Sequence, residues 1–356
     1  KQIQRSVYGA TQQEVRKKLA QVTTALDCGD YFQPSKMTLA RWVELWLQEY
    51  TSDKKYLTVK HYTAQCKTHI VPSLGAVKLA ELTAPQIQAF YNGLLRDGMA
   101  PKSVRNIHGI LTKCLSTAVS VEYIRDNPAS RVTLPRVEKK EIHPLTDEQV
   151  KDFLRVSAGD EYEILLKVIL FTGLRESEAI GLTWDCVDFK AGTVKVCKQL
   201  QKRPLSDGGF TFAPLKNDKT RTLRPAPFVL ELLERRKREQ AEQRLKAGEL
   251  WVGWQTTDQQ KSALVFTTAT GSNLSPQTVY NHYKKLASQI GAPDSRVHDL
   301  RHTFAVLSLQ NGDDVKTVQG NLGHATAAFT LDVYGHVSER MKEDTAARMQ
   351  EYISNL

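Results

Sequence analysis

The residues best suited to chemistry lie in the last third of the chain. His298 and Arg301 are three residues apart, and His324 and Tyr334 follow them. On a helix, residues three apart share a face, so an imidazole and a guanidinium can point at one anion. Gly323 predicts a break between helices that leaves His324 at a helix edge. Tyr334 then adds a phenol that can act as a nucleophile, and the set is suited to attack on a phosphodiester.

A second arginine, Arg175, follows a Thr-Gly pair and lies at a predicted helix start. Arginine offers a bidentate fork that keeps its proton, which suits Arg175 and Arg301 to a phosphate that gains charge in the transition state. A tyrosine has an unperturbed pKa of about 10, so Tyr334 needs such cations nearby to react at neutral pH. Glu178, one helical turn after Arg175, could orient its guanidinium, and a helix-surface carboxylate is the equal alternative.

The local sequences around Arg175, His298, Arg301, His324 and Tyr334 resemble the tyrosine recombinase (phage integrase) family. The resemblance extends over about residues 36–356 and is greatest to integrases of conjugative transposons and of related temperate phages. It implies a site-specific DNA recombinase that integrates or excises a mobile genetic element. Such an enzyme cleaves and rejoins strands through a 3′-phosphotyrosine intermediate, with Tyr334 as the nucleophile.

The segment 214–221 is similar to the lysine-bearing hairpin of that family. This similarity implies that Lys216 is the catalytic lysine, which protonates the departing 5′ oxygen, with Lys219 as its nearest rival. A solvated turn lysine is the alternative. The resemblance also makes His324 a hydrogen-bond donor to a phosphate oxygen. For His298 two roles remain open, because it can accept the phenolic proton or donate a hydrogen bond.

No cofactor is expected, because a phosphotyrosine retains the energy of the broken DNA bond. The sequence also lacks a P-loop and a carboxylate cluster spaced for two metal ions. Two alternatives to a recombinase are a type IB topoisomerase-like enzyme and a catalytically silent DNA-binding regulator. A separate core-binding bundle and a C-terminal tail favour recombination over relaxation, and the complete set of catalytic residue types argues against a silent regulator.

Composition is consistent with a DNA partner without identifying one. The 356 residues suggest two or three domains, and 49 Lys and Arg against 39 Asp and Glu give a net charge of +10. The five cysteines are scattered, which indicates buried thiols rather than a disulfide framework or a zinc site. No stretch resembles a signal peptide or a membrane span, so we expect a cytoplasmic, nucleoid-associated protein with no membrane partner.

The elements that must hold the DNA form a helical core-binding domain at 35–130. Amphipathic patterns predict helices over 39–50, 58–70, 83–96 and 102–121, with Thr38 as an N-cap and with Trp42 and Trp46 in the core. Basic side chains would neutralise phosphates there and on the lysine hairpin. The DNA-binding candidates are Lys60, Lys67, His69, Lys102, Arg105, His108, Lys113 and Lys219.

The catalytic domain is expected at 145–336, mainly α-helical with a small antiparallel β-sheet and an exposed hairpin. Thr146 predicts a helix start, an apolar run predicts a buried helix over 164–171, and further helices are expected over 227–246 and 279–290. Alternation predicts strands at 193–196, 210–212 and 220–223. The basic run 235–238 is expected on a solvated helix face.

Three other segments complete the predicted organisation. Residues 1–34 resemble the tail of an arm-type DNA-binding domain with its connecting helix, whose front we expect to be missing, and a linker helix that touches no DNA is the alternative. Residues 131–144 predict an interdomain linker. Residues 337–356 form an amphipathic tail that, by resemblance, packs on a neighbouring protomer of a homo-tetramer on DNA, or else on its own domain. The resemblance also makes an excisionase or a host DNA-bending protein possible partners.

Overall fold

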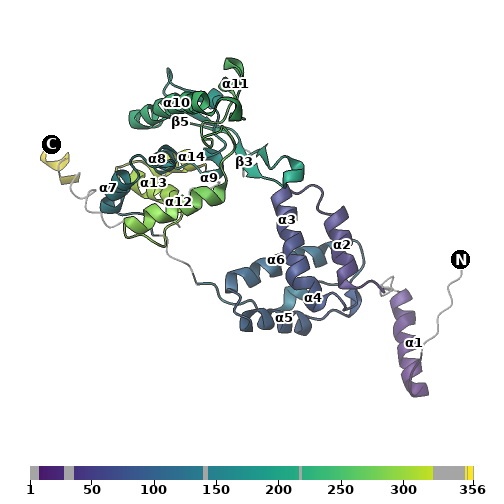
Figure 1. Cartoon of the computed structure of the whole chain (residues 1–356). Helices are drawn as coiled ribbons and strands as arrows, with labels where there is room; N and C mark the ends of the chain where they lie inside the picture. The colour runs from purple at the N-terminus through teal and green to yellow at the C-terminus, as the bar shows by residue number, and fades with distance from the viewer. Residues whose placement is uncertain are drawn as a thin grey trace. The chain divides into compact units, whose positions relative to one another are not determined.

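A computed structural model describes residues 8–27, 36–138, 143–215, 219–323, 349–350 and 352–355. The chain divides into two compact units, Lys1–Lys139 and Lys140–Leu356, and each is described by itself (Figure 1). No helix among the described residues is both long enough and apolar enough to cross a membrane. Cys66, Cys114 and Cys186 are buried thiols and Cys197 is partly exposed, whereas Cys28 lies outside the described residues.

The first unit is helical, as predicted. Its helices are α1 (Gln12–Asp27), α2 (Leu39–Glu49), α3 (Tyr56–Gln65), α4 (Val71–Leu74), α5 (Ala84–Arg96) and α6 (Pro101–Ser120), with short 3-10 turns η2 (Leu79–Glu81) and η3 (Pro128–Arg131). The helix predicted over 58–70 continues through α4 by way of a π-helical turn, η1 (Cys66–Ile70). There the Val71 amide donates to the Cys66 carbonyl, and this wider turn comes just before Pro72, which has no amide hydrogen to donate.

Two tryptophans join α2 to α6 in the core of this unit. Trp42 and Trp46 are 0% and 3% exposed, which confirms their predicted place in the core. Their indole N–H groups donate to the Cys114 carbonyl at 3.0 Å and to the Thr117 hydroxyl at 3.1 Å. Buried indoles need such partners, so these bonds fix how α2 crosses α6. The Thr38 hydroxyl caps α2 by accepting from the Arg41 amide, as its sequence predicted.

The front of the predicted linker packs on the first unit. The Thr133 amide donates to the Gln88 side chain at 2.8 Å, and Arg105 donates to the Pro135 carbonyl at 2.7 Å. Val132 and Leu134 also pack against the core of this unit. Residues 132–135 therefore belong structurally to the helical bundle.

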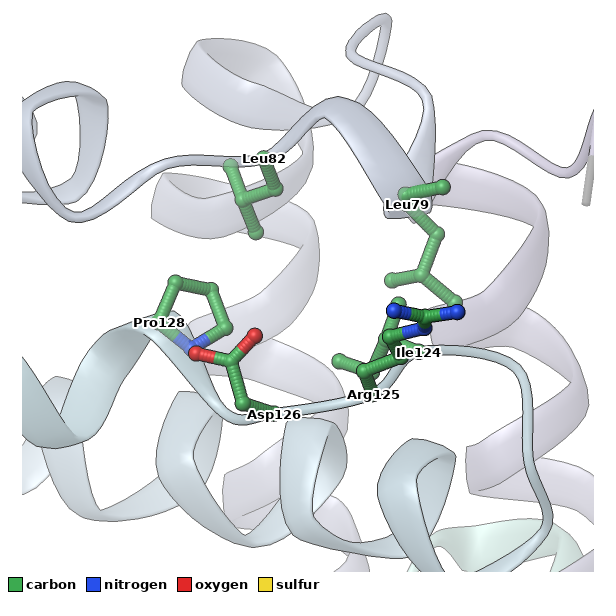
Figure 2. Close-up of a pocket in the computed structure, with 7 residues that line it drawn as sticks. Leu79, Leu82, Ile124, Arg125, Asp126 and Pro128 are labelled. Atoms are coloured by element: carbon green, nitrogen blue, oxygen red, sulfur yellow. The ribbon is translucent and has the colours of Figure 1, made fainter. Parts of the chain in front are cut away.

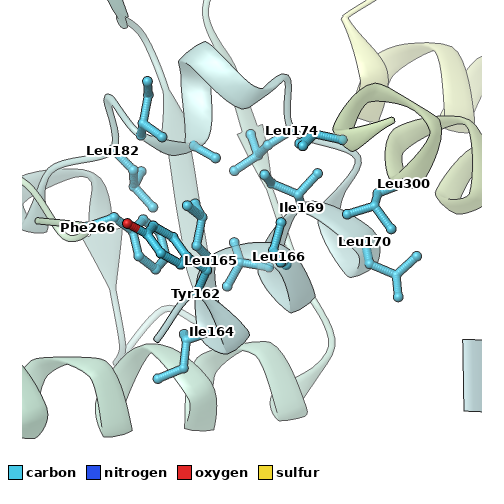
Figure 3. Packing of buried hydrophobic residues seen from close by; sticks show 14 of the residues in the cluster. Tyr162, Ile164, Leu165, Leu166, Ile169, Leu170, Leu174, Leu182, Phe266 and Leu300 are labelled. Carbon is cyan, nitrogen blue, oxygen red and sulfur yellow. The ribbon is translucent and has the colours of Figure 1, made fainter. Parts of the chain in front are cut away.

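The second unit is built around one apolar helix. Its helices are α7 (Asp147–Val156), α8 (Glu163–Thr172), α9 (Glu176–Ala179), α10 (Pro227–Ala247), α11 (Thr257–Lys261), α12 (Pro276–Gln289), α13 (Val297–Gln310) and α14 (Val315–Leu322), with 3-10 turns η4 (Trp184–Cys186), η5 (Leu205–Asp207) and η6 (Gly248–Leu250). Helix α8 is buried along nearly its whole length, as the apolar run predicted. Figure 3 shows Leu166, Ile169 and Leu170 of this helix beside Leu300 of α13.

The β-structure is small and antiparallel, as predicted, and it is divided between two sheets. Within the described residues, β1 (Val187–Asp188), β2 (Thr193–Val196) and β5 (Arg221–Leu223) form one antiparallel sheet, and β3 (Gln199–Lys202) with β4 (Phe210–Ala213) forms another. In the first sheet Val194 pairs with Leu223, and in the second Leu200 pairs with Phe212. The chain thus completes a separate hairpin between β2 and β5. Strand β3 escaped prediction because Gln199-Leu200-Gln201-Lys202 has little β-propensity.

The basic run on α10 also departs from prediction, because Arg236 is buried. Its guanidinium donates to the carbonyls of Val265 at 3.0 Å and Thr267 at 3.2 Å. Arg236 is 6% exposed, and burial lowers its pKa. It therefore anchors the segment that follows α11 onto α10, and the predicted solvated face is wrong at this position.

Candidate active site

Arg175 is presented by a tight turn between α8 and α9. Gly173 ends α8 in the left-handed conformation, with φ of 65°. A Cβ atom at Gly173 would lie 2.5 Å from Phe304 of α13 and 2.7 Å from Leu322 of α14. Glycine is needed at this position for both reasons. The turn leaves Arg175 at the N-cap of α9 with an extended backbone.

Glu178 holds Arg175 from one turn further along α9. The Arg175 guanidinium donates to Glu178 Oε1 at 2.7 Å, and the Arg175 amide donates to Oε2 at 3.0 Å. The Glu178 side chain is 1% exposed and that of Arg175 is 21% exposed. The structure therefore brings these two predicted residues together and leaves part of the guanidinium open to a ligand.

A second cation on Glu178 was not predicted. Arg221 of β5 donates to Glu178 Oε2 at 2.6 Å and to Oε1 at 3.2 Å, and its side chain is 10% exposed. Burial by itself would raise the pKa of Glu178, but the hydrogen bond and charge of Arg221, followed by those of Arg175, bring that pKa down to about 2. The alternation of side chains along a strand could have indicated that Arg221 points inward, because Arg221 shares a face of β5 with Leu223, which is buried.

Arg301 lies in the interior of the second unit. It is 1% exposed, and its terminal nitrogens donate to the carbonyls of Gly173 and Leu322, both at 2.5 Å. The sequence placed Arg301 beside His298 facing an open anion site. In the structure those two nitrogens bind main-chain carbonyls instead, and they join the end of α8 to the end of α14.

The three arginines meet at the C-terminal end of α14. Their pairs are Arg221 Nε with the Asn321 carbonyl at 2.7 Å, Arg301 with the Leu322 carbonyl at 2.5 Å, and Arg175 with the Gly323 carbonyl at 3.4 Å. We call these three carbonyls the α14 carbonyl terminus. The last carbonyls of a helix lack intrahelical partners and carry the negative end of its dipole, so they attract cations. Gly323 ends the helix with φ of 63°, as predicted.

Two histidines lie on the first turns of α13. His298 is exposed at the surface, yet the surrounding protein lowers its pKa, through desolvation first and then through the charge of Arg301. His302 is 9% exposed, and burial followed by the effect of His298 lowers its pKa to about 4. The two rings are in edge-to-face contact, with centroids 4.8 Å apart. Both imidazoles are therefore neutral at neutral pH, and a neutral imidazole can accept one proton and donate another.

The charges of this cluster favour an anion. Among the described residues, Arg175 and Arg221 share the carboxylate of Glu178, and Arg301 binds neighbouring main-chain carbonyls, so the three guanidiniums carry more positive charge than this one carboxylate balances. The exposed part of Arg175 is the side on which a ligand can approach. A phosphate is the kind of anion that a guanidinium fork binds well.

Three predicted catalytic residues, Lys216, His324 and Tyr334, lie outside the described residues. Gly323, which follows the last residue of α14, directly precedes His324 in the chain. Leu215, which precedes Lys216, is 3% exposed and belongs to the core of the second unit. The described parts therefore fix the positions of the residues that directly precede Lys216 and His324 in the chain.

The DNA-binding candidates are mostly exposed. Those with exposed side chains are Lys60, Lys67, Lys102, Arg105 and Lys113 in the first unit and Lys219 in the second. By helical spacing the three on α6 lie within one side of that helix. Lys113 also donates to the Tyr62 hydroxyl at 3.0 Å. His69 is half-buried, and His108 is also half-buried, bonds to the Tyr91 hydroxyl at 3.1 Å and has a pKa lowered by burial, so His108 is no phosphate-binding cation.

A pocket of about 180 Å³ in the first unit offers a different kind of site. Figure 2 shows it between η2 and the loop after α6, where Leu79 and Leu82 face Ile124, Arg125, Asp126 and Pro128. Asp126 is paired with Arg131 at 2.5 Å. The lining includes neither an imidazole nor a nucleophile, so the candidate chemistry belongs to the arginine cluster of the second unit.

Comparison with known families gives two matches. The model described as the phage integrase family matches residues 138–341, which is more than half of the chain. The model described as the phage integrase N-terminal SAM-like domain matches residues 38–95.

Relatives and solved structures agree with these matches. The "Tyrosine recombinase XerC-like" protein of Caldanaerobacter subterraneus subsp. tengcongensis is 26% identical over 366 residues, covering 99% of this chain and 92% of the relative. The ICEBs1 integrase of Bacillus subtilis is 25% identical over 311 residues, covering 85% and 78%. The Tn1549 transposon integrase in complex with a circular intermediate DNA has a TM-score of 0.73 at 19% identity, covering 88% of this chain and 99% of that one. A lambda integrase tetramer bound to a Holliday junction has a TM-score of 0.62 at 19% identity, covering 92% and 89%.

Proposed function

The chain belongs to the phage integrase family of tyrosine recombinases, and we propose that it integrates or excises a mobile DNA element. The observation that carries the proposal is the arginine cluster. Arg175, Arg221 and Arg301 converge on the α14 carbonyl terminus, directly before His324. An exposed portion of Arg175 within a net positive cluster supports binding of a DNA phosphate.

In the proposed reaction the phenolic oxygen of Tyr334 attacks phosphorus and the 5′ oxygen of the next nucleotide leaves. A 3′-phosphotyrosine bond forms as the phosphorus–oxygen bond of the DNA breaks. Arg175 offsets charge on the non-bridging oxygens, Arg301 adds positive charge from the interior of the cluster, and His324 is a further hydrogen-bond donor. Lys216 protonates the leaving oxygen, and Lys219 is its alternative. Attack by a free 5′ hydroxyl reverses the step and rejoins the strand without a cofactor.

His298 has the properties of a general base in this scheme. Its lowered pKa keeps the imidazole neutral at neutral pH, so a ring nitrogen is available to accept the phenolic proton. Its place on the first turn of α13, one turn before Arg301, supports this role. Glu178 acts behind these groups by holding the guanidinium of Arg175.

The proposed substrate is double-stranded DNA at the attachment sites of an element. Similar chains have been solved with a circular intermediate DNA and, as a tetramer, with a Holliday junction. We extend both features to this chain, with the helical domain 35–130 holding the duplex and the tail 337–356 packing between protomers. The proposal also includes an arm-type module before residue 35, a linker near 131–144 and a catalytic domain over 145–336. The proposed partner protein is an excisionase or a DNA-bending protein. Its place in the cell would then be with the DNA, in the cytoplasm.

The test is a suicide-substrate assay with a nicked duplex from the end of the element. Wild type, Tyr334→Phe and Arg301→Ala are compared, with Tyr352→Phe as a matched control because Tyr352 is an exposed tyrosine in the C-terminal segment. Wild type and Tyr352→Phe should form a covalent protein–DNA band, whereas Tyr334→Phe and Arg301→Ala should bind without linking.

The outcomes separate the proposal from its rivals. Specific binding by wild type without any covalent band would favour a DNA-binding regulator and would overturn the catalytic roles. A covalent band that persists in Tyr334→Phe would assign the nucleophile to another residue. Covalent linkage with relaxation of supercoils but no exchange of partners would indicate a topoisomerase.

A further inference from the structure

We propose that Arg221 is a positioning residue for the strand-cleavage reaction. Its guanidinium would fix Arg175, through Glu178, relative to the turn at Gly323, which directly precedes His324 in the chain. The inference rests on the proposed function, since it concerns the same site. Arg221 lies on β5, and the groups that it joins lie on α9 and α14.

All three nitrogens of the Arg221 guanidinium have partners. Nη1 and Nη2 donate to the two carboxylate oxygens of Glu178, and Nε donates to the Asn321 carbonyl at 2.7 Å. A planar guanidinium with bonds on two sides has little freedom to rotate. These bonds therefore fix the distance between the carboxylate that holds Arg175 and the end of α14.

The turn after α14 packs directly on the same guanidinium. A Cβ atom at Gly323 would lie 3.1 Å from Arg221 Nη1 and 3.4 Å from its Cδ. The positive φ of Gly323 turns the chain at this contact. Arg221 thus supports both the last carbonyls of α14 and the backbone that leads to His324, which is an observation independent of its ion pair with Glu178.

A direct contact between Arg221 and DNA is disfavoured by the same geometry. Its side chain is 10% exposed, compared with 21% for Arg175. Because its three nitrogens already have acceptors, a phosphate would have to replace a buried carboxylate or a helix carbonyl. We therefore assign Arg221 an indirect role and leave the phosphate to Arg175.

The positioning role of Arg221 predicts a measurable change in the pH dependence of cleavage. The charged groups that face Glu178 are Arg221 from β5 and Arg175 from the start of α9, and Arg221 has the larger lowering effect on the pKa of Glu178. Without Arg221, burial would raise that pKa toward the assay range. Glu178 would then take up a proton as the pH falls and release Arg175.

The experiment compares Arg221→Met and Arg221→Lys with wild type in single-turnover cleavage of the nicked duplex at saturating DNA. Arg224→Met is the matched control, because Arg224 is an exposed arginine three residues further along the chain that donates to the Ala191 carbonyl at 3.3 Å. Arg221→Met should lose on the order of a hundredfold in cleavage rate with DNA affinity unchanged. Arg221→Lys should also be slow, because an ammonium cannot form the bidentate fork.

The pH profile distinguishes positioning from a merely structural role. Cleavage by Arg221→Met should fall steeply as the pH is lowered from about 8 to about 5.5, beyond the fall in wild type and Arg224→Met, because Glu178 becomes protonated. His298 and Glu176 are present in all of these proteins, so wild type and Arg224→Met provide the background to which the additional fall is compared. Arg221→Lys keeps a positive charge near Glu178, so its rate should be low but its profile closer to wild type.

Three results would overturn the inference. Cleavage by Arg221→Met within about threefold of wild type would show that Arg175 needs no such support. Unfolding of the second unit of both Arg221 variants under the assay conditions, seen as complete loss of hydrogen-exchange protection in α13, would make Arg221 a stability residue. Absence of cleavage by wild type would instead overturn the proposed function, and this inference with it.

Discussion

Replacing Glu178 by glutamine removes the carboxylate between Arg175 and Arg221 while preserving its size. The pKa of Glu178 falls from an ordinary 4.5 to about 2 in the folded protein. That lowering corresponds to about 3 kcal/mol of stability when the carboxylate is ionised. With the side chain 1% exposed, little solvent screening reduces this value. We therefore expect Glu178→Gln to destabilise the second unit by about 3 kcal/mol at neutral pH.

The pH dependence has a definite sign. Because the folded-state pKa is depressed, the contribution of Glu178 is fully present above about pH 4.5 and is lost as the pH falls toward about 2. The glutamine variant has no proton to gain at this position. The difference in stability between wild type and Glu178→Gln should therefore narrow as the pH falls below about 4.5.

The assay is hydrogen exchange of α13 amides, followed by mass spectrometry in increasing urea at about pH 7.5 and about pH 3.5 and corrected for intrinsic exchange rates. Amides of α6 provide an internal control, since they belong to the first unit. Equal protection of α13 in both proteins at neutral pH would refute the reasoning. So would a difference that stays constant down to about pH 3.5.

Glu176, two residues before Glu178, is a matched control whose pKa is shifted in the opposite direction. Burial raises its pKa to about 7, and its Oε1 has no hydrogen-bond partner. A raised folded-state pKa means that stability is lost as the pH rises from about 4.5 through about 7. Glu176→Gln should consequently protect α13 better than wild type at about pH 8. A loss of protection there would show that an unrecognised partner stabilises its carboxylate.

Three further predictions concern other parts of the chain. Gly173→Ala should lower the free energy of unfolding by about 2 kcal/mol or more in thermal or urea unfolding, since its methyl group would clash with Phe304 at a positive φ. Gly159→Ala, with open space around its Cβ, should lower it less. Arg236→Met should cost about 2–3 kcal/mol in urea unfolding of the second unit, because buried carbonyls lose their donor, and a neutral result would contradict this. Alanine at both Lys102 and Lys113 should reduce the slope of log affinity against log salt by about two, and an unchanged slope would exclude them from the DNA interface.

Much of the fold was predictable because its signals are local. Thr38 and Thr146 cap helices at the predicted positions, and a Thr-Gly break ends α8 before Arg175. The apolar run of α8 marked the buried centre of the second unit. Each of these features depends on residues within about one turn of helix, so each can be predicted from the sequence alone.

The candidate site was predictable only in part. The family resemblance predicted Arg175, His298 and Arg301 as site residues, helical spacing added Glu178 as a partner for Arg175, and the family matches confirm the membership on which the resemblance rested. It gave no indication that Arg301 is buried against main-chain carbonyls. That arrangement requires the ends of α8 and α14 to meet, and no local pattern encodes their meeting.

Two arginines show what the sequence determined and what only the tertiary structure decided. The sequence placed Arg221 on a strand and Arg236 on a helix, and both positions are correct. Their burial was decided by acceptors far along the chain, because Arg221 bonds to Glu178 43 residues away and to Asn321 100 residues away, and Arg236 to Val265 29 residues away. A charged side chain can be buried only where hydrogen-bond acceptors or opposite charges compensate the loss of water. Packing between distant segments therefore determined which arginines are buried and which cations remain exposed.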